Sequence, residues 1–308
     1  MIVSASRRTD IPCYYSAWLI NRLKSGYVYM RNPMNHRQLY RVNLSADSVD
    51  CIVFWTKDSM NIMDKLDVLD KMGYKYYFQF TLNPYDRTTE KNLRNKNDII
   101  SSFIQLGEIL GSQRVKWRYD PIIINNRYNV EYHISEFSSL CESLCRYTDS
   151  VTVSIIDMYK SIANKLEVDK DIDKYLRVCE FVGKKAQECG LKSYACCEKN
   201  DLSEFGITKS SCIDKQTIEQ ICGYVLKTDK DRNQRSGCGC YQSIDIGSYN
   251  TCNNSCVYCY ANNSKSILEK NLKNYNPDNE ILSGKIEKGE KVILKNMSSN
   301  MSEQFLLT

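Results

Sequence analysis

Three cysteines near the carboxyl end of the chain share one short segment. Cys252, Cys256 and Cys259 have the spacing C-x3-C-x2-C, which is too compact for each side chain to enter a separate core. Three thiolates that converge on one site are typical ligands of zinc or of an iron–sulfur cluster. A 4Fe–4S cluster held by only three protein thiolates leaves one iron open for another ligand. The spacing therefore predicts a metal centre in this loop.

A second group of cysteines lies just upstream of this loop. Its members are Cys196, Cys197, Cys212, Cys238 and Cys240. Cys212, Cys238 and Cys240, together with one of the adjacent pair, would supply the four thiolates of an auxiliary iron–sulfur cluster or of a structural zinc site. We expect Cys197 to be the fourth ligand, because Cys196 would then face the opposite side of an extended chain. The C-x-C spacing is less typical of zinc than C-x2-C, which favours a second 4Fe–4S cluster.

Composition restricts how the cysteines are interpreted. The chain has 308 residues, of which 42% are hydrophobic and 26% charged, as in ordinary soluble globular proteins. It shows no apolar run of about 20 residues and no secretory leader at its start, so we expect a cytoplasmic protein without membrane segments. In that reducing compartment, 15 cysteines favour metal or redox chemistry over disulfides. The two histidines, His36 and His133, argue against a His-rich zinc site.

Strand-like and helix-like stretches alternate through the first two-thirds of the chain, as in βαβ units. The expected strands are Ile2–Ala5, Cys51–Trp55, Tyr76–Leu82, Val115–Tyr119, Ser150–Ile155, Lys192–Cys196 and Ser243–Ile246. The expected helices are Ser16–Lys24, Met60–Met72, Asp98–Leu110, Tyr132–Arg146 and Asp171–Cys189. This order predicts a partial or complete parallel (β/α) barrel similar to a TIM barrel, with a doubly wound open sheet as the alternative.

We divide the chain into three parts on this basis. Residues 1–195 form the barrel core, and residues 196–242 form a cysteine-rich segment for the auxiliary cluster. Residues 243–308 contain the last barrel strand, the three-cysteine loop and a C-terminal tail.

Charged side chains collect where the expected strands end, which is where barrels and open parallel sheets bind their ligands. The candidate catalytic residues are Arg7, Arg8, Asp10, Lys57, Arg118 and Asp120. A guanidinium group could hold a carboxylate or phosphate through two hydrogen bonds. Capping of the following helices and salt bridges in loops are the structural alternatives. No Walker loop and no G-x-G-x-x-G motif is present.

The three-cysteine loop, with Tyr258 directly before the last cysteine, resembles the signature of the radical S-adenosylmethionine (SAM) superfamily. The resemblance implies a SAM-binding 4Fe–4S cluster, reductive cleavage of SAM to a 5′-deoxyadenosyl radical, and hydrogen abstraction from a substrate. Tyr258, Gln79, Thr81 and Ser154 are then candidates for binding the cofactor.

The wider segment from Tyr249 to Asn262 resembles the cluster loop of spore photoproduct lyase. In the superfamily this loop usually follows the first barrel strand, whereas here it lies near the carboxyl end. A permuted order would reconcile the two if Ser243–Ile246 takes the place of the first strand. Ile2–Ala5 would then be its neighbour in the sheet.

Residues 1–295 as a whole resemble an uncharacterised bacterial family known as domain of unknown function 1848. The matching segments include Ser6–Pro12, Val53–Lys57, Trp117–Ile122 and Asp245–Gly247. This resemblance supports the fold and the cofactor but implies no particular reaction.

Two functional hypotheses follow. The first is a radical SAM-type enzyme with an unknown substrate, two clusters, and a low-potential electron donor such as ferredoxin or flavodoxin. A nucleic-acid substrate is suggested only by the resemblance to photoproduct lyase, since a net charge of +5 is a modest excess. The alternative is a non-catalytic zinc or iron–sulfur protein that binds nucleic acid or a protein partner.

Overall fold

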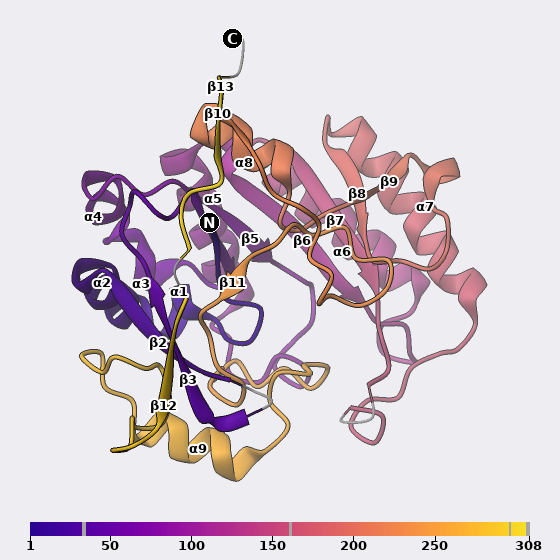
Figure 1. Ribbon diagram of the computed structural model, residues 1–308. Coiled ribbons are helices and arrows are strands. Elements are labelled where there is room, and N and C mark those ends of the chain that lie inside the picture. Colours follow the sequence, from indigo (N-terminus) through magenta and orange to yellow (C-terminus); the bar gives the residue numbers. More distant parts are fainter. Residues whose placement is uncertain (33–34, 160–161, 296, 306–308) are drawn as a thin grey trace.

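The computed structural model describes residues 1–32, 35–159, 162–295 and 297–305. Its main sheet has eight strands in the order β11-β1-β4-β5-β6-β7-β8-β9, and every neighbouring pair is parallel (Figure 1). These strands are β11 (Ile244–Asp245), β1 (Ile2–Ala5), β4 (Cys51–Thr56), β5 (Tyr76–Thr81), β6 (Val115–Ile122), β7 (Ser150–Ile155), β8 (Lys192–Cys196) and β9 (Ile207–Ser210). The expected α/β fold is therefore confirmed.

The sheet is not a closed barrel. Its edge strands, β11 and β9, form no ladder with each other in the described part of the chain. The expectation of a TIM-like barrel is thus supported only as a large parallel α/β sheet. The doubly wound alternative requires the strand order to reverse at a central switch point, whereas from β1 to β9 the order runs in one direction.

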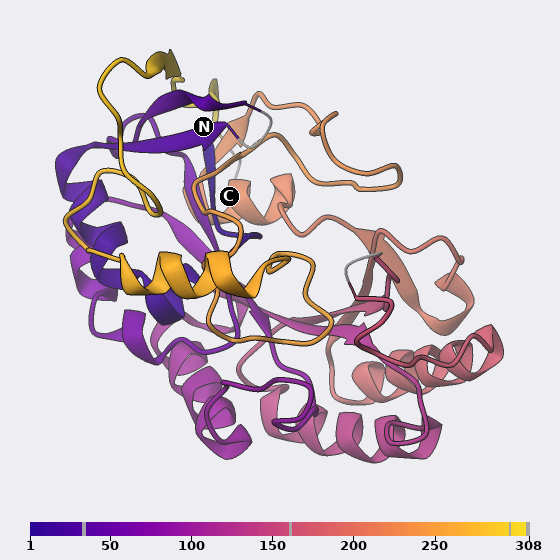
Figure 2. The ribbon, with the colours of Figure 1, turned by 90° about the horizontal axis from the view of Figure 1, so that it is seen from below.

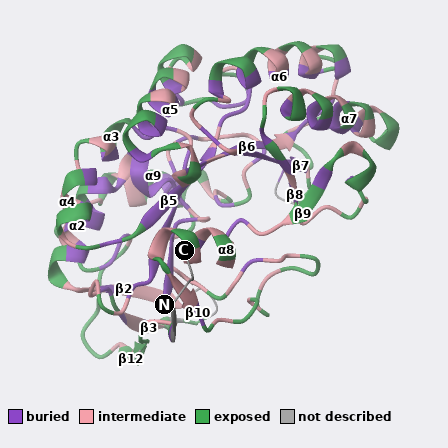
Figure 3. Ribbon diagram, turned by 90° about the horizontal axis from the view of Figure 1, so that it is seen from above, coloured by how far each residue is buried: buried purple, intermediate pink, exposed green. Residues whose placement is uncertain are grey.

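Helices between the strands form an arc around the outer side of the sheet (Figures 1 and 3). They are α2 (Ser16–Ser25), α3 (Met60–Met63), α4 (Leu66–Lys71), α5 (Lys96–Leu110), α6 (Val130–Leu144) and α7 (Ile172–Glu188). A connection between parallel neighbours is almost always right-handed, so strands added in one direction place their helices on one side. The expected helix over Met60–Met72 is divided in two, with Asp64 and Lys65 between the halves.

Each long helix buries one stripe of apolar side chains against the sheet, which is why its sequence has a helical period. In α5, for example, Ile99, Phe103, Leu106 and Leu110 are buried. Strands β1, β4 and β5 are buried on both faces, as expected for central strands of a covered parallel sheet. Phe54 and Phe78 stack between neighbouring strands with ring centroids 4.7 Å apart.

Strand β11 is the sheet neighbour of β1, as expected from the sequence. Val3 pairs with Ile244 and Ser4 pairs with Asp245, in parallel. The strand that leads into the three-cysteine loop is therefore the edge neighbour of the first strand of the chain.

Several smaller elements lie outside the main sheet, and the sequence analysis did not predict them. A hairpin of β2 (Tyr27–Asn32) and β3 (Asn35–Asn43) is extended by β12 (Lys291–Lys295), which is parallel to β3. The strand β10 (Tyr224–Leu226) pairs antiparallel with β13 (Met301–Phe305). The short helices are α1 (Ile11–Tyr14), α8 (Lys215–Cys222), α9 (Lys265–Lys273) and the 3₁₀ turns η1 (Ser112–Arg114) and η2 (Ser203–Phe205). Viewed from below, α9 lies in front of the sheet (Figure 2).

Among the described helices, none combines the length and apolar character needed to cross a bilayer.

Candidate functional site

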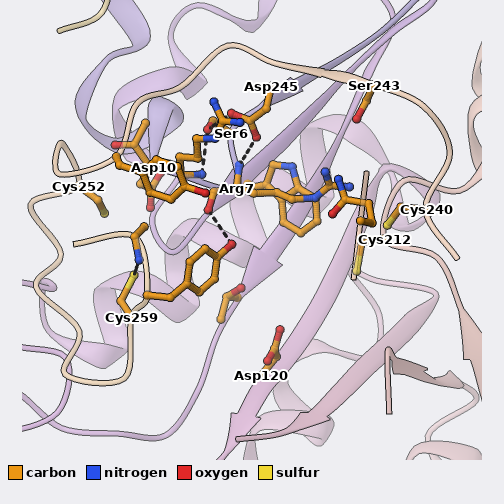
Figure 4. Close-up of a pocket in the computed structure, with 18 of the residues that line it drawn as sticks. Ser6, Arg7, Asp10, Asp120, Cys212, Cys240, Ser243, Asp245, Cys252 and Cys259 are labelled. Carbon is orange, nitrogen blue, oxygen red and sulfur yellow. Dashed lines mark hydrogen bonds between the residues drawn. The ribbon is translucent and has the colours of Figure 1, made fainter. Parts of the chain in front are cut away.

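A cavity of about 1000 Å³ lies at the carboxyl ends of the parallel strands, where β1, β4, β5, β7, β8 and β11 give way to loops. Of the site residues predicted from the sequence, all but Gln79 line it. Both groups of cysteines also face this cavity. In the view of Figure 4, Ser6 and Arg7 lie between Cys252 and Cys259 on one side and Cys212 and Cys240 on the other.

The three-cysteine loop is anchored to the start of the chain. Asn254 donates a hydrogen bond to the Oδ2 of Asp10 (3.1 Å) and accepts one from the hydroxyl of Tyr14 (2.8 Å). Cys256 forms an isolated antiparallel bridge with Glu90. The amide of Cys259 donates to the carbonyl of Cys256 (3.1 Å). These contacts fix a loop that has no regular secondary structure of its own.

Asp10 is the junction between this loop and the end of β4. Its carboxylate accepts hydrogen bonds from four donors, the amides of Cys13 (3.0 Å) and Lys57 (2.8 Å), the hydroxyl of Thr56 (2.8 Å) and the side chain of Asn254. Burial nevertheless raises the pKa of Asp10 to about 6. A residue predicted as catalytic therefore also caps α1 and positions the loop.

A buried ionic cluster lies beneath the loop. Glu90, only 1% exposed, accepts hydrogen bonds from Lys57 (2.8 Å), Lys96 (2.9 Å) and the hydroxyl of Tyr258. Burial would raise the pKa of Glu90, but the two lysines outweigh it and lower that pKa. The Nζ of Lys57 also lies 5.4 Å from the centroid of the Tyr258 ring. Lys57 is therefore a buried cation beside the three-cysteine loop.

Asp245, at the end of β11, holds together another wall of the cavity, where the start of the chain meets the segment after β11. It accepts hydrogen bonds from Ser4 (2.9 Å), from Ser6 (2.6 Å) and from the amides of Arg7 (2.8 Å) and Gly247 (3.0 Å). The backbone approaches so closely here that a Cβ atom on Gly247 would lie 2.0 Å from the Oγ of Ser6. Only glycine fits at position 247 without displacing Ser6.

The second cysteine group is centred on Cys212. Its Sγ lies 3.0 Å from that of Cys196. Cys212 also lies close to Cys240, which in turn lies close to Cys238. The preference for Cys197 over Cys196 is not supported by this geometry. Strand β8 ends at Cys196, and Cys197 adopts a left-handed conformation with φ 59°. Its Sγ instead approaches the carbonyl of Ser236 (3.4 Å).

Two arginines, Arg7 after β1 and Arg118 within β6, face this group. Arg118 donates to the Sγ of Cys212 (2.6 Å) and also to Asp120. Arg7 lies close to Cys240. Both guanidinium carbons lie 5.3 Å from the centroid of the Trp55 ring, and Trp55 donates to Ser4 (3.1 Å). Arg8, by contrast, lies over the ring of Tyr249 (5.2 Å), at the start of the three-cysteine loop.

The predicted cofactor-binding residues lie in different places. Tyr258, Thr81 and Ser154 line the cavity, whereas Gln79 is buried and donates to the carbonyl of Cys212 (2.7 Å). Ser154 donates to Glu198 (3.0 Å). Gln79 therefore supports the backbone of a cysteine rather than facing the cavity.

Within the described residues, no group of three or more His, Cys, Asp or Glu side chains is already arranged as a metal site. The chemistry of the donors nevertheless fits a metal. Burial raises the pKa of Cys252 to about 12 and also raises the pKa of Cys259. Burial alone therefore favours the neutral thiols, and a bound metal would favour the thiolates that act as its ligands.

The other cysteines and His133 are buried or partly buried in the packed structure. Cys13, Cys51, Cys141 and Cys179 are buried, and Cys145, Cys189 and Cys222 are partly buried. His133 is fully buried between the hydroxyl of Tyr119 (2.7 Å) and the carbonyl of Ile123 (2.8 Å). Burial lowers its pKa to about 4. The side chain of His36 lies outside the described residues.

Sequence reasoning missed several residues that build this site. Asp245 follows the same strand-end rule that selected Asp10, so the rule could have found it. Trp55 was assigned to a strand but not to the site. Glu90 lies in an irregular segment between β5 and α5, and no local pattern marks it.

Comparison with known proteins identifies a family. No curated protein matches the chain. Among solved structures, a putative alpha-L-fucosidase from Bacteroides thetaiotaomicron VPI-5482 shows 10% identity and a TM-score of 0.26, over 56% of this chain and 79% of that one. This similarity is too low to support any inference. A family described as a domain of unknown function matches residues 2–261. The protein therefore belongs to the family "Domain of unknown function (DUF1848)".

Proposed function

We propose that this protein is a radical SAM-type iron–sulfur enzyme. The observation that carries the proposal is the position of Cys252, Cys256 and Cys259. All three thiols come from one loop and line the cavity at the carboxyl ends of the parallel strands. Three thiolates are the protein ligands that a 4Fe–4S cluster with one open iron requires. When bound, such a cluster would supply the electron for reductive cleavage of SAM and so initiate hydrogen abstraction from a substrate.

The residues around the loop have roles in this proposal that follow from their contacts. Lys57 adds positive charge beside Tyr258 and Cys256, which favours thiolates over thiols. Arg8 lies against Tyr249 of the loop and is the candidate clamp for the SAM carboxylate, since a guanidinium group binds carboxylates through paired hydrogen bonds. Asp10 holds the loop through Asn254.

The cavity leaves room for a substrate beside SAM. Its volume of about 1000 Å³ is at the upper end of the range for small-molecule sites. Its lining contains both acids and bases, among them Asp120, Asp157 and Arg235. We propose a polar substrate, together with a low-potential donor such as ferredoxin or flavodoxin.

The test is anaerobic purification and iron–sulfur reconstitution, followed by reduction with dithionite in the presence of SAM. Formation of 5′-deoxyadenosine is expected from the wild-type protein and not from Cys256→Ala. Cys145→Ala, at the end of α6 and outside the cavity, is the matched control and should retain it. A protein that holds iron at the loop but neither binds nor cleaves SAM would refute the proposal. Zinc without iron would favour the non-catalytic alternative.

A further inference from the structure

We propose that Cys196, Cys212, Cys238 and Cys240 bind a second iron–sulfur cluster whose negative charge is balanced by Arg7 and Arg118. This site is distinct from the three-cysteine loop. It does not depend on whether that loop binds SAM, because its four thiols leave no need for an outside ligand.

Four thiols from separate parts of the chain come together at this site. Cys196 lies at the end of β8, Cys212 follows β9, and Cys238 and Cys240 come from the segment before β11. The chain nevertheless brings them into one set of contacts, in which Cys212 reaches both Cys196 (3.0 Å) and Cys240, and Cys240 reaches Cys238. Core packing does not require four thiols to meet. Soft ligands in this number suit an iron–sulfur cluster or zinc.

Arg7 and Arg118 place two positive charges beside these thiols. Burying a guanidinium group is costly unless an anion compensates it. Arg118 is 6% exposed, and one of its nitrogens lies 2.6 Å from the Sγ of Cys212. The Nη2 of Arg7 is buried, with no hydrogen-bond partner among the described residues. A cluster with four thiolates carries a net negative charge, and its sulfur atoms accept hydrogen bonds. It would supply an acceptor for the unpaired Nη2 of Arg7 and would add a second negative charge beside Arg118, which already pairs with Asp120.

The neighbouring Cys197 gives the assignment a sharp internal control. Cys196 and Cys197 are adjacent, yet only Cys196 contacts Cys212, while Cys197 approaches the carbonyl of Ser236. If the loss of a thiol acted only by destabilising this segment, Cys196→Ala and Cys197→Ala would lower the iron content to a similar extent. If Cys196 is a cluster ligand, only Cys196→Ala should lower it.

The first experiment measures iron, sulfide and zinc per chain after anaerobic reconstitution. We expect about eight irons in the wild-type protein and about four in Cys196→Ala, with the wild-type content retained in Cys197→Ala. Cys256→Ala should also retain about four, which separates failure of the first site from failure of the second. The proposal is overturned if Cys196→Ala keeps the full iron content, if zinc replaces iron at this site, or if Cys196 and Cys212 form a disulfide without metal.

The second experiment tests the arginines and does not depend on Cys196→Ala folding. In the Cys256→Ala background, only the second cluster remains to be titrated. Arg118→Gln and Arg7→Gln should each lower its reduction potential, because a nearby positive charge favours the reduced, more negative cluster. Arg118→Lys and Arg7→Lys retain the charge and should restore most of the shift. Equal potentials in the glutamine variants and the parent would refute the role of the arginines.

Discussion

Replacing Glu90 with glutamine should destabilise the protein and, if the three-cysteine loop binds iron, lower the iron content. The carboxylate is 1% exposed and receives three hydrogen bonds, from Lys57, Lys96 and Tyr258. Glutamine has nearly the same shape but carries no charge, and its amide group would turn a donor toward one of these three donors. Lys57, with 14% of its side chain exposed, would then be a buried cation without its counter-ion.

The expected loss of stability can be calculated from the burial of Glu90 and its ion pairs. Breaking a buried ion pair by removing one partner costs about 3–5 kcal/mol. For 308 residues, an unfolding entropy of about 2.1 cal/mol/K per residue gives about 0.65 kcal/mol/K at the melting temperature. The expected decrease in Tm is therefore about 5–8 °C. Because the two lysines lower the pKa of Glu90, its contribution is present above pH 4.5 and is lost as the pH falls through the lowered value.

The assay is thermal unfolding at pH 7 and pH 4, together with the iron content of the reconstituted protein. Glu269→Gln is the matched control, since its pair with Lys265 is exposed and long, at 3.8 Å, and it should leave Tm unchanged. A Glu90→Gln protein with the Tm of wild type at pH 7 would refute the reasoning. A lower Tm with full iron content would show that Glu90 stabilises the fold but is not needed for the three-cysteine loop to bind iron.

Three further predictions follow from the site. Gly247→Ala should cost about 1–3 kcal/mol, because its Cβ would lie 2.0 Å from the Oγ of Ser6. The measurement is chemical denaturation. The loss of unfolding free energy caused by Gly247→Ala should be smaller in a Ser6→Gly background, and equal losses in both backgrounds would contradict the close approach of Gly247 to Ser6. Since burial raises the pKa of Asp10 to about 6, ionisation of Asp10 destabilises the fold. Between pH 4 and pH 7 the wild type should lose about 2 kcal/mol relative to Asp10→Asn, and a constant difference in unfolding free energy would disprove this. Arg8→Ala should weaken SAM binding about 10–100-fold in equilibrium dialysis with unchanged iron content, and unchanged affinity would count against the clamp.

The sequence predicted seven strands of the main sheet but missed its edge strand β9, which lies in the segment assigned to the cysteine-rich part. Ile2–Ala5, Ser150–Ile155 and Lys192–Cys196 are strands with the predicted bounds. Buried parallel strands are short apolar runs bounded by polar residues, so local composition is enough to find them. Closure of the sheet depends on strand tilt and stagger, which periodicity does not encode. The barrel expected from the strand count was therefore not found.

The predicted site residues came from a rule about strand ends rather than from local pattern. That rule works because the carboxyl ends of parallel strands meet at one edge of the sheet. It failed for Gln79, whose side chain leaves β5 on the side of Cys212 rather than into the cavity. The choice of Cys197 over Cys196 came from a different assumption, an extended chain beyond the end of β8, which the structure does not show. The turn at Cys197, with φ 59°, is set by tertiary contacts and not by its own residue type.

The cavity is assembled from the two ends of the chain, and this links its formation to folding. Asp245 bonds to Ser4, Ser6 and Arg7 across separations of 238–241 residues, and Asn254 bonds to Asp10 across 244. Contacts of such high sequence separation must pay for loop closure before they contribute to stability. A ligand that binds only the assembled loop stabilises the folded state by mass action. Any metal centre held by Cys252, Cys256 and Cys259 would therefore secure β11 against β1, and with it the wall of the cavity that Asp245 builds.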